Sequence, residues 1–168
     1  EVLEEIVLNE MNKMIEKYGI RNVVLDPVMV STSGHKLIED DAIESIKNRL
    51  IPLSRVITPN IPEAEILSGC KISSEQDFEQ IAKKLSFNKS VSVLLKAGHL
   101  DNDCLVDYFY NVEDNTITLL PSKRVKTRNT HGTGCTFSSA FASALARGED
   151  LTLAAKSAKK YIEQAIEF

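Results

Sequence analysis

The run of eight residues from Asn129 to Thr136 (Asn-Thr-His-Gly-Thr-Gly-Cys-Thr) concentrates more chemistry than any other segment of this chain. Gly132 and Gly134 permit backbone conformations in which successive N–H groups turn toward one point, and a helix that begins here adds the positive end of its dipole. Such a loop binds anions, and phosphate is the expected ligand. The same positive field favours the thiolate of Cys135, which can then act as a base or a nucleophile. The alternative is a glycine-rich turn capped by threonine, with a buried cysteine.

Four further polar residues, Asp26, Asn60, Glu63 and Lys96, follow short apolar runs that are typical of buried strands. Ligands of parallel sheets bind at the carboxyl ends of the strands, so we expect these residues to face one site together with the glycine loop. Phosphoryl transfer needs such a set, because it depends on positioning and charge neutralisation. Mg²⁺ uses few protein carboxylates directly and keeps several waters, so Asp26 and Glu63 suffice to hold it, while Lys96 holds phosphate oxygens.

Each of these residues also has a structural interpretation. Asp26-Pro27 is a common junction between a strand and a turn, and Asn60 and Glu63 have the spacing of a helix capping box. Lys96 is costly to bury without an anion nearby, but a long lysine side chain can also reach solvent. The GxxxxGK[ST] pattern of a P-loop is absent, so the predicted anion site is the loop that precedes Cys135.

The spacing of apolar residues predicts the elements that position these groups. Three short strands that alternate with helices imply a parallel sheet, and two longer strands around a polar turn imply an antiparallel hairpin at one sheet edge. The predicted fold class is α/β, a three-layer α/β/α sandwich within a single domain of residues 1–168. Its expected helices cover residues 2–18, 40–50, 62–69, 74–87, 135–146 and 151–166, and its expected strands cover 23–25, 55–59, 91–96, 104–110 and 116–120.

Composition narrows the class of partner. The 168 residues are 43% hydrophobic and 26% charged with a net charge of −4, which fits a globular domain without a basic stripe for nucleic acid or anionic lipid. No apolar run approaches the roughly 20 residues of a membrane span, and the first residues are too acidic for a signal or transit peptide, so we expect a cytoplasmic protein with a small-molecule substrate. Cys70, Cys104 and Cys135 form no CxxC pair, which argues against disulfides and zinc.

Four segments together resemble the hydroxymethylpyrimidine/phosphomethylpyrimidine kinases of thiamine biosynthesis, which belong to the ribokinase-like superfamily. The resemblance runs through the whole chain in the family's order, and its last segment is the most specific. Ribokinase-like enzymes generally carry an aspartate as the base at the end of that segment, whereas this subgroup, like this chain, carries cysteine. The segments are Asp26–Met29, Thr58–Ala64, Leu95–His99 and Asn129–Thr136.

The resemblance implies ATP-dependent phosphorylation of 4-amino-5-hydroxymethyl-2-methylpyrimidine and of its monophosphate, with ATP and Mg²⁺ as cofactors. It implies that Cys135 draws the proton from the substrate, while the N–H groups of three neighbouring residues stabilise the transferring phosphoryl group. It further implies that two carboxylates manage magnesium, that three residues bind the nucleotide and that one contacts the pyrimidine. The three N–H groups are those of Gly132, Thr133 and Gly134, and the two carboxylates are those of Asp26 and Glu63. The residues implied to bind the nucleotide are Asn60, Lys96 and Thr130, and the residue implied to contact the pyrimidine is Val28.

The chain also departs from the family pattern. Family members begin with a strand, a glycine-rich turn and a polar substrate-binding segment, and they end with a short tail, so we expect this chain to be the C-terminal two-thirds of a ribokinase-like domain. A pyridoxal or pyridoxine kinase is one alternative, because relatives with a similar cysteine loop accept that ring. A catalytically silent nucleotide-binding fragment is another. The resemblance also implies a homodimer.

Overall fold

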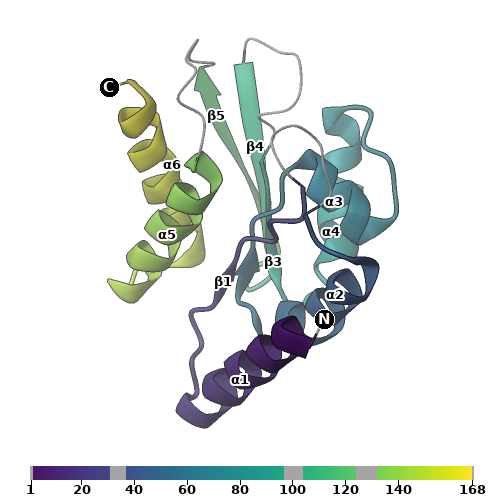
Figure 1. Cartoon of the computed structure of the whole chain (residues 1–168). Helices are drawn as coiled ribbons and strands as arrows, with labels where there is room; N and C mark the ends of the chain where they lie inside the picture. The colour runs from purple at the N-terminus through teal and green to yellow at the C-terminus, as the bar shows by residue number, and fades with distance from the viewer. Residues whose placement is uncertain (1, 31–36, 97–103, 124–131, 168) are drawn as a thin grey trace.

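The computed structural model describes residues 2–30, 37–96, 104–123 and 132–167. Within these ranges, five strands form one mixed sheet in the order β1-β2-β3-β4-β5 (Figure 1). The first three strands are parallel, and the last two form an antiparallel hairpin that pairs with β3 at one edge. The prediction of parallel strands with an edge hairpin is confirmed. The strands are β1 (Val24–Leu25), β2 (Val56–Ile57), β3 (Ser92–Leu95), β4 (Cys104–Asn111) and β5 (Thr116–Lys123).

Helices cover both faces of the sheet and make three layers (Figure 1). One face carries α5 (Thr133–Ala146) and α6 (Leu151–Glu167). The other face carries α2 (Asp40–Ser45), α3 (Ile61–Ser68) and α4 (Phe78–Leu85). The predicted α/β/α sandwich is therefore confirmed.

Alternation along the strands separates two apolar cores. Successive strand residues point to opposite faces. Val56 and Leu94 accordingly pack in the cluster that contains Phe141 of α5, whereas Ile57 and Val93 pack in the cluster of α2, α3 and α4. All four residues of β3 are buried. Both faces of β2 and β3 are thus covered, so their ends are fixed points from which polar side chains can be positioned.

Two predicted helices are shorter in the structure. The helix expected over residues 40–50 is α-helical only to Ser45 and continues as a π-helix (Ile46–Leu50) and a 3₁₀ turn (Ile51–Leu53). Pro52 has no N–H for a helical hydrogen bond, which explains why no α-helix continues beyond it. The helix expected over 74–87 begins with a 3₁₀ turn (Glu75–Asp77), and α4 ends at Leu85 because three residues from Phe87 onward have positive φ.

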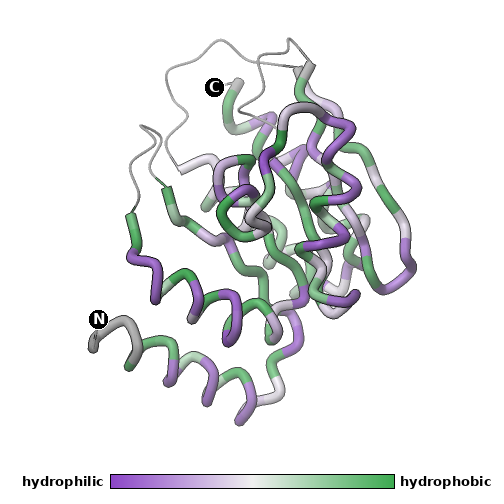
Figure 2. Tube along the Cα trace, turned by 90° about the vertical axis from the view of Figure 1, so that its right-hand side faces the viewer, coloured by the Kyte–Doolittle hydropathy of each residue, from purple (hydrophilic) through white to green (hydrophobic). Residues whose placement is uncertain are grey.

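The N-terminal helix α1 (Val2–Tyr18) lies on the outside of the fold, where hydrophobic residues alternate with hydrophilic ones along it (Figure 2). Several of its apolar side chains are exposed, for example Ile6 at 52% and Val7 at 50%. Of the helices that the structure describes, none combines the length and the apolar character needed to cross a membrane.

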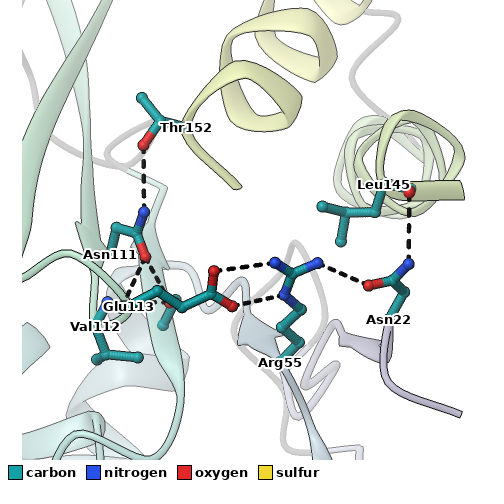
Figure 3. A network of polar contacts seen from close by, with 8 residues as sticks. Asn22, Arg55, Asn111, Val112, Glu113, Leu145 and Thr152 are labelled. Atoms are coloured by element: carbon teal, nitrogen blue, oxygen red, sulfur yellow. Dashed lines mark hydrogen bonds and ion pairs between the residues drawn. The ribbon is translucent and has the colours of Figure 1, made fainter. Parts of the chain in front are cut away.

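A polar network at the amino end of β2 anchors the far end of α5 (Figure 3). The guanidinium of Arg55 donates to both carboxylate oxygens of Glu113, at 2.7 and 3.0 Å, and to Asn22 Oδ1 at 2.8 Å. Asn22 in turn donates to the carbonyl of Leu145, near the end of α5, at 3.4 Å. Because this end of α5 is tied to the sheet, the helix start is held over the opposite end of the strands.

Candidate active site

The carboxyl ends of the parallel strands bring Asp26 and Lys96 together, as the sequence predicts. Lys96 Nζ lies 2.8 Å from Asp26 Oδ1, and the two side chains are only 18% and 13% exposed. The backbone of Lys96 continues β3 through a parallel bridge to Asn60, and its N–H donates to the carbonyl of Pro59 at 3.0 Å. The ammonium therefore lies against a carboxylate within the fold, which contradicts the alternative in which it extends to solvent.

Two hydroxyl groups that sequence reasoning missed connect Asp26 to helix α5. Thr58, which is fully buried after β2, donates to Asp26 Oδ1 at 3.0 Å. Its hydroxyl oxygen lies 3.0 Å from that of Ser138, and Ser138 donates to the carbonyl of Gly134 at 3.0 Å. The available signal was weak: Thr58 directly follows a short apolar strand, and Ser138 lies within a helix rich in alanine and serine.

The first turn of α5 lies directly against the charge pair. Gly132 precedes the helix in a left-handed conformation with φ of 76°, which glycine adopts without steric cost. A Cβ added at Gly134 would lie 3.2 Å from Lys96 Nζ and 3.5 Å from Asp26 Oδ2. The absence of a side chain at Gly134 thus lets an ammonium approach the N–H groups at the helix start, where anions bind.

Cys135 is exposed in the first turn of α5, so the alternative of a buried cysteine is wrong. It lies at one end of a groove of about 500 Å³ between α5 and α6. Both Cys135 and Cys70 are free thiols. The groove is lined by Cys135, Thr136, Ser139, Ala140, Ser143, Arg147, Ser157 and Tyr161. The thiol is therefore accessible to a ligand and stands at the positive end of the helix dipole.

Asn60 and Glu63 form a capping box at the start of α3. Glu63 N–H donates to Asn60 Oδ1 at 3.0 Å, and Asn60 N–H donates to Glu63 Oε2 at 2.9 Å. The structural interpretation of their spacing is thus confirmed. Glu63 Oε1 also accepts from the Met29 N–H at 3.4 Å.

The Glu63 carboxyl is also electrostatically coupled to the charge pair. Its residue is 2% exposed, and burial raises the pKa of Glu63. The Asn60 N–H and the Lys96 ammonium oppose that rise, whereas Asp26 adds to it. The cap therefore also contributes to the charge balance at the strand ends.

The remaining predicted residues divide into one that is available and one that the structure does not describe. Val28 is 47% exposed two residues after Asp26, and its N–H donates to the Asp26 carbonyl at 2.9 Å. Thr130 lies outside the described residues. In the ranges that the structure covers, no three His, Cys, Asp or Glu residues gather as a ligand set. Two carboxylates fit Mg²⁺ nonetheless, because this ion completes its shell with water and phosphate oxygens.

Comparison with known proteins identifies the family. The family model described as phosphomethylpyrimidine kinase matches residues 2–168. This chain belongs to the phosphomethylpyrimidine kinase family. A thiamine biosynthesis bifunctional protein of Geobacter sulfurreducens is 44% identical over 152 residues, which are 90% of this chain and 31% of that protein. A hydroxymethylpyrimidine/phosphomethylpyrimidine kinase of Rhizobium meliloti is 40% identical over 153 residues, which are 90% of this chain and 56% of that protein. The chain thus spans about a third of the first of these relatives and just over half of the second.

Solved structures of family relatives have the same ribokinase-like fold. A phosphomethylpyrimidine kinase from Clostridium difficile superposes with a TM-score of 0.79 at 36% identity, over 95% of this chain and 64% of that one. A pyridoxal kinase from Staphylococcus aureus, solved with AMP-PCP and pyridoxal, superposes with a TM-score of 0.85 at 31% identity, over 98% of this chain and 58% of that one. Two vitamin kinases with different substrates thus share this half of the fold.

Proposed function

We propose that this chain carries the phosphoryl-transfer half of an ATP-dependent kinase that acts on 4-amino-5-hydroxymethyl-2-methylpyrimidine and on its monophosphate, in thiamine diphosphate biosynthesis. Family membership and relatives named hydroxymethylpyrimidine/phosphomethylpyrimidine kinase support this reaction. One observation carries the proposal: the Lys96–Asp26 pair lies against Gly134 at the start of α5. Cation, carboxylate and helix N–H groups are the components that a transferring phosphoryl group requires.

Lys96 and the start of α5 would bind the nucleotide phosphates. The ammonium is balanced by Asp26 in the structure and would exchange that partner for a phosphate oxygen. The N–H groups of Gly132, Thr133 and Gly134 would stabilise the phosphoryl group during transfer, because backbone N–H groups and the helix dipole at a helix N-terminus favour a bound anion. Thr130 and Asn60 would lie beside the nucleotide, although the side chain of Asn60 already caps α3.

Asp26 is the residue best placed to hold magnesium. Both of its hydrogen bonds to Lys96 and Thr58 are made by Oδ1, while Oδ2 is directed toward Gly134. Glu63, whose two oxygens accept backbone hydrogen bonds, would act through water. When bound, Mg²⁺ neutralises the charge of the nucleotide phosphates.

Cys135 would take the proton from the substrate hydroxyl or phosphate group. Its thiol is free and exposed in the first turn of α5, which gives a substrate access to it. Val28 would contact the pyrimidine ring. We also propose that the protein acts as a homodimer in the cytoplasm.

Pyridoxal phosphorylation is the second candidate function. The Staphylococcus aureus pyridoxal kinase superposes with a higher TM-score, 0.85 against 0.79, than the Clostridium difficile phosphomethylpyrimidine kinase. Pyridoxal and hydroxymethylpyrimidine each carry a hydroxymethyl group on a nitrogen heterocycle, so the same phosphate site would serve the phosphorylation of either one. The ring pocket therefore decides between them.

A kinase assay tests these functions. The chain is incubated with ATP and Mg²⁺ and, in separate reactions, with hydroxymethylpyrimidine, its monophosphate or pyridoxal, and release of ADP is followed. We expect turnover with the two pyrimidines, and a loss of about 10²–10⁴-fold in Cys135→Ala, as for removal of a general base. Turnover with pyridoxal alone would establish the second function. A folded chain that binds ADP without turnover would be a silent nucleotide-binding fragment.

A further inference from the structure

The buried hydroxyl groups of Thr58 and Ser138 form a continuous chain from the Asp26 carboxylate to the backbone of α5. Three contacts of 3.0 Å make up this chain: Thr58 to Asp26 Oδ1, Thr58 to Ser138, and Ser138 to the Gly134 carbonyl. Thr58 is fully buried and Ser138 is 8% exposed. Water therefore does not readily replace either partner, and the orientation of each hydroxyl depends on the other.

The count of protons decides how this chain is arranged. Two hydroxyl groups supply two protons for three contacts. An ionised Asp26 accepts from Thr58, so the contact between the hydroxyls requires Ser138 to donate to Thr58. When Ser138 instead donates to Gly134, the Thr58 oxygen lacks a donor from Ser138. Thr58 therefore donates to the carboxylate in both arrangements, and Ser138 adds a hydrogen bond that fixes the orientation of the Thr58 hydroxyl in the first one.

Asp26 needs the hydrogen bond from Thr58 because its other donor, Lys96, also has to bind phosphate in the proposed reaction. In the structure Lys96 donates to the same oxygen, Asp26 Oδ1, at 2.8 Å. In the proposed reaction this ammonium turns to a nucleotide phosphate, and the carboxylate, whose side chain is 13% exposed, loses its cation. A largely buried carboxylate that loses its cation costs free energy unless another hydrogen-bond donor still contacts it. Thr58 remains, since its short side chain is fixed next to strand β2.

We propose that Thr58 and Ser138 are positioning residues for nucleotide binding: Ser138 orients the Thr58 hydroxyl, and Thr58 holds Asp26 toward the start of α5 when Lys96 moves to phosphate. This inference rests on the proposed function, in which Asp26 takes part in magnesium binding. Neither hydroxyl needs to touch the nucleotide. Their effect passes through the carboxylate, so it should depend on the metal.

Calorimetric titration of the 168-residue chain with ADP, in excess Mg²⁺ and separately in excess EDTA, tests the proposal. Thr58→Val keeps the shape of the side chain and removes the hydroxyl, while Thr58→Ser restores it. We expect Thr58→Val to weaken MgADP binding about tenfold and metal-free ADP binding less than about twofold, and Thr58→Ser to stay near the unaltered chain, since one charge-assisted hydrogen bond is at stake.

Ser138→Ala should weaken MgADP binding by about threefold and add nothing in a Thr58→Val background, because its effect passes through Thr58. Ser86→Ala is the matched control: Ser86 is 1% exposed and donates to the Lys83 carbonyl at the end of α4. This control should lower stability without changing either titration.

Three results would overturn the inference. The first is unaltered MgADP binding by Thr58→Val. The second is an equal loss with and without Mg²⁺, which would assign Thr58 a structural role only. The third is an additive effect of Ser138→Ala in the Thr58→Val background. No ADP binding by the unaltered, folded chain would instead overturn the proposed function, and this inference with it.

Discussion

Replacement of Gly134 with alanine should reduce nucleotide binding without reducing stability. The added Cβ would lie 3.2 Å from Lys96 Nζ and 3.5 Å from Asp26 Oδ2, so the ammonium must move by a few tenths of an ångström. The contacted atoms are the ends of side chains, which adapt. Gly134 lies inside α5 and is not among the glycines with positive φ, so alanine is compatible with its backbone.

The magnitude follows from the charges involved. A hydrogen bond to a charged group contributes about 1.5–3 kcal/mol, and every 1.4 kcal/mol changes affinity tenfold. Because the methyl group displaces the ammonium that would meet the phosphate, we expect MgADP affinity to fall about tenfold. Alanine is the better helix former by up to about 1 kcal/mol, so the urea midpoint of unfolding should stay equal or rise. Calorimetric titration and urea unfolding measure the two quantities.

Gly148→Ala is the matched control at the other end of α5. Gly148 has a φ of 88° and nothing within 4 Å of an added Cβ. Alanine is strained there by about 1–2 kcal/mol, so this variant should lose stability and keep its MgADP affinity. The reasoning is refuted if Gly134→Ala binds MgADP like the unaltered chain. It is equally refuted if the variant is destabilised as strongly as Gly148→Ala.

Three further predictions concern buried polar groups. Lys96→Met leaves Asp26 without its cation and should lower the free energy of unfolding, measured with urea, by about 3 kcal/mol. The double variant Lys96→Met/Asp26→Asn should recover part of that loss, and equal stability of the single and double variants would contradict this. Burial raises the pKa of Glu63, so the free energy of unfolding should fall as pH rises above 4.5 and this carboxyl ionises within the fold. Glu63→Gln should therefore be as stable as the unaltered chain in more acidic solution and become relatively more stable as pH rises, whereas a difference in stability that does not depend on pH would contradict this. Burial also raises the pKa of Tyr108 to about 12, and its hydroxyl has no hydrogen-bond partner within the ranges the structure covers. Tyr108→Phe should therefore unfold at the same or a higher urea concentration than the unaltered chain, whereas a clear loss of stability would show that the hydroxyl is bonded.

Apolar patterns were sufficient to predict the elements and the layers. The buried run at β3 and the helical spacing in α5 and α6 carry their own signal, because the period of apolar residues differs between strands and helices. The π-helical turn after Ser45 was not predictable from such a period, since the period shows which residues face the core and not which carbonyl each backbone N–H bonds.

The candidate site was predictable only as a set of strand ends. The rule that ligands bind at the carboxyl ends of parallel strands brought Asp26 and Lys96 to the same edge. It did not reveal that they pair, or that Thr58 and Ser138 join them to α5, because these contacts cross 32 to 80 residues of chain. The spacing of Asn60 and Glu63 also predicted a capping box, and the structure contains that box.

A crystal structure of the chain with MgADP would test the central claim most directly, which is that the start of α5 and Lys96 bind nucleotide phosphate. We predict a terminal phosphate oxygen about 3 Å from Lys96 Nζ and from a backbone N–H in the first turn of α5, with Thr58 still bonded to Asp26. Phosphates bound elsewhere, with Lys96 still paired to Asp26 as it is without nucleotide, would contradict it.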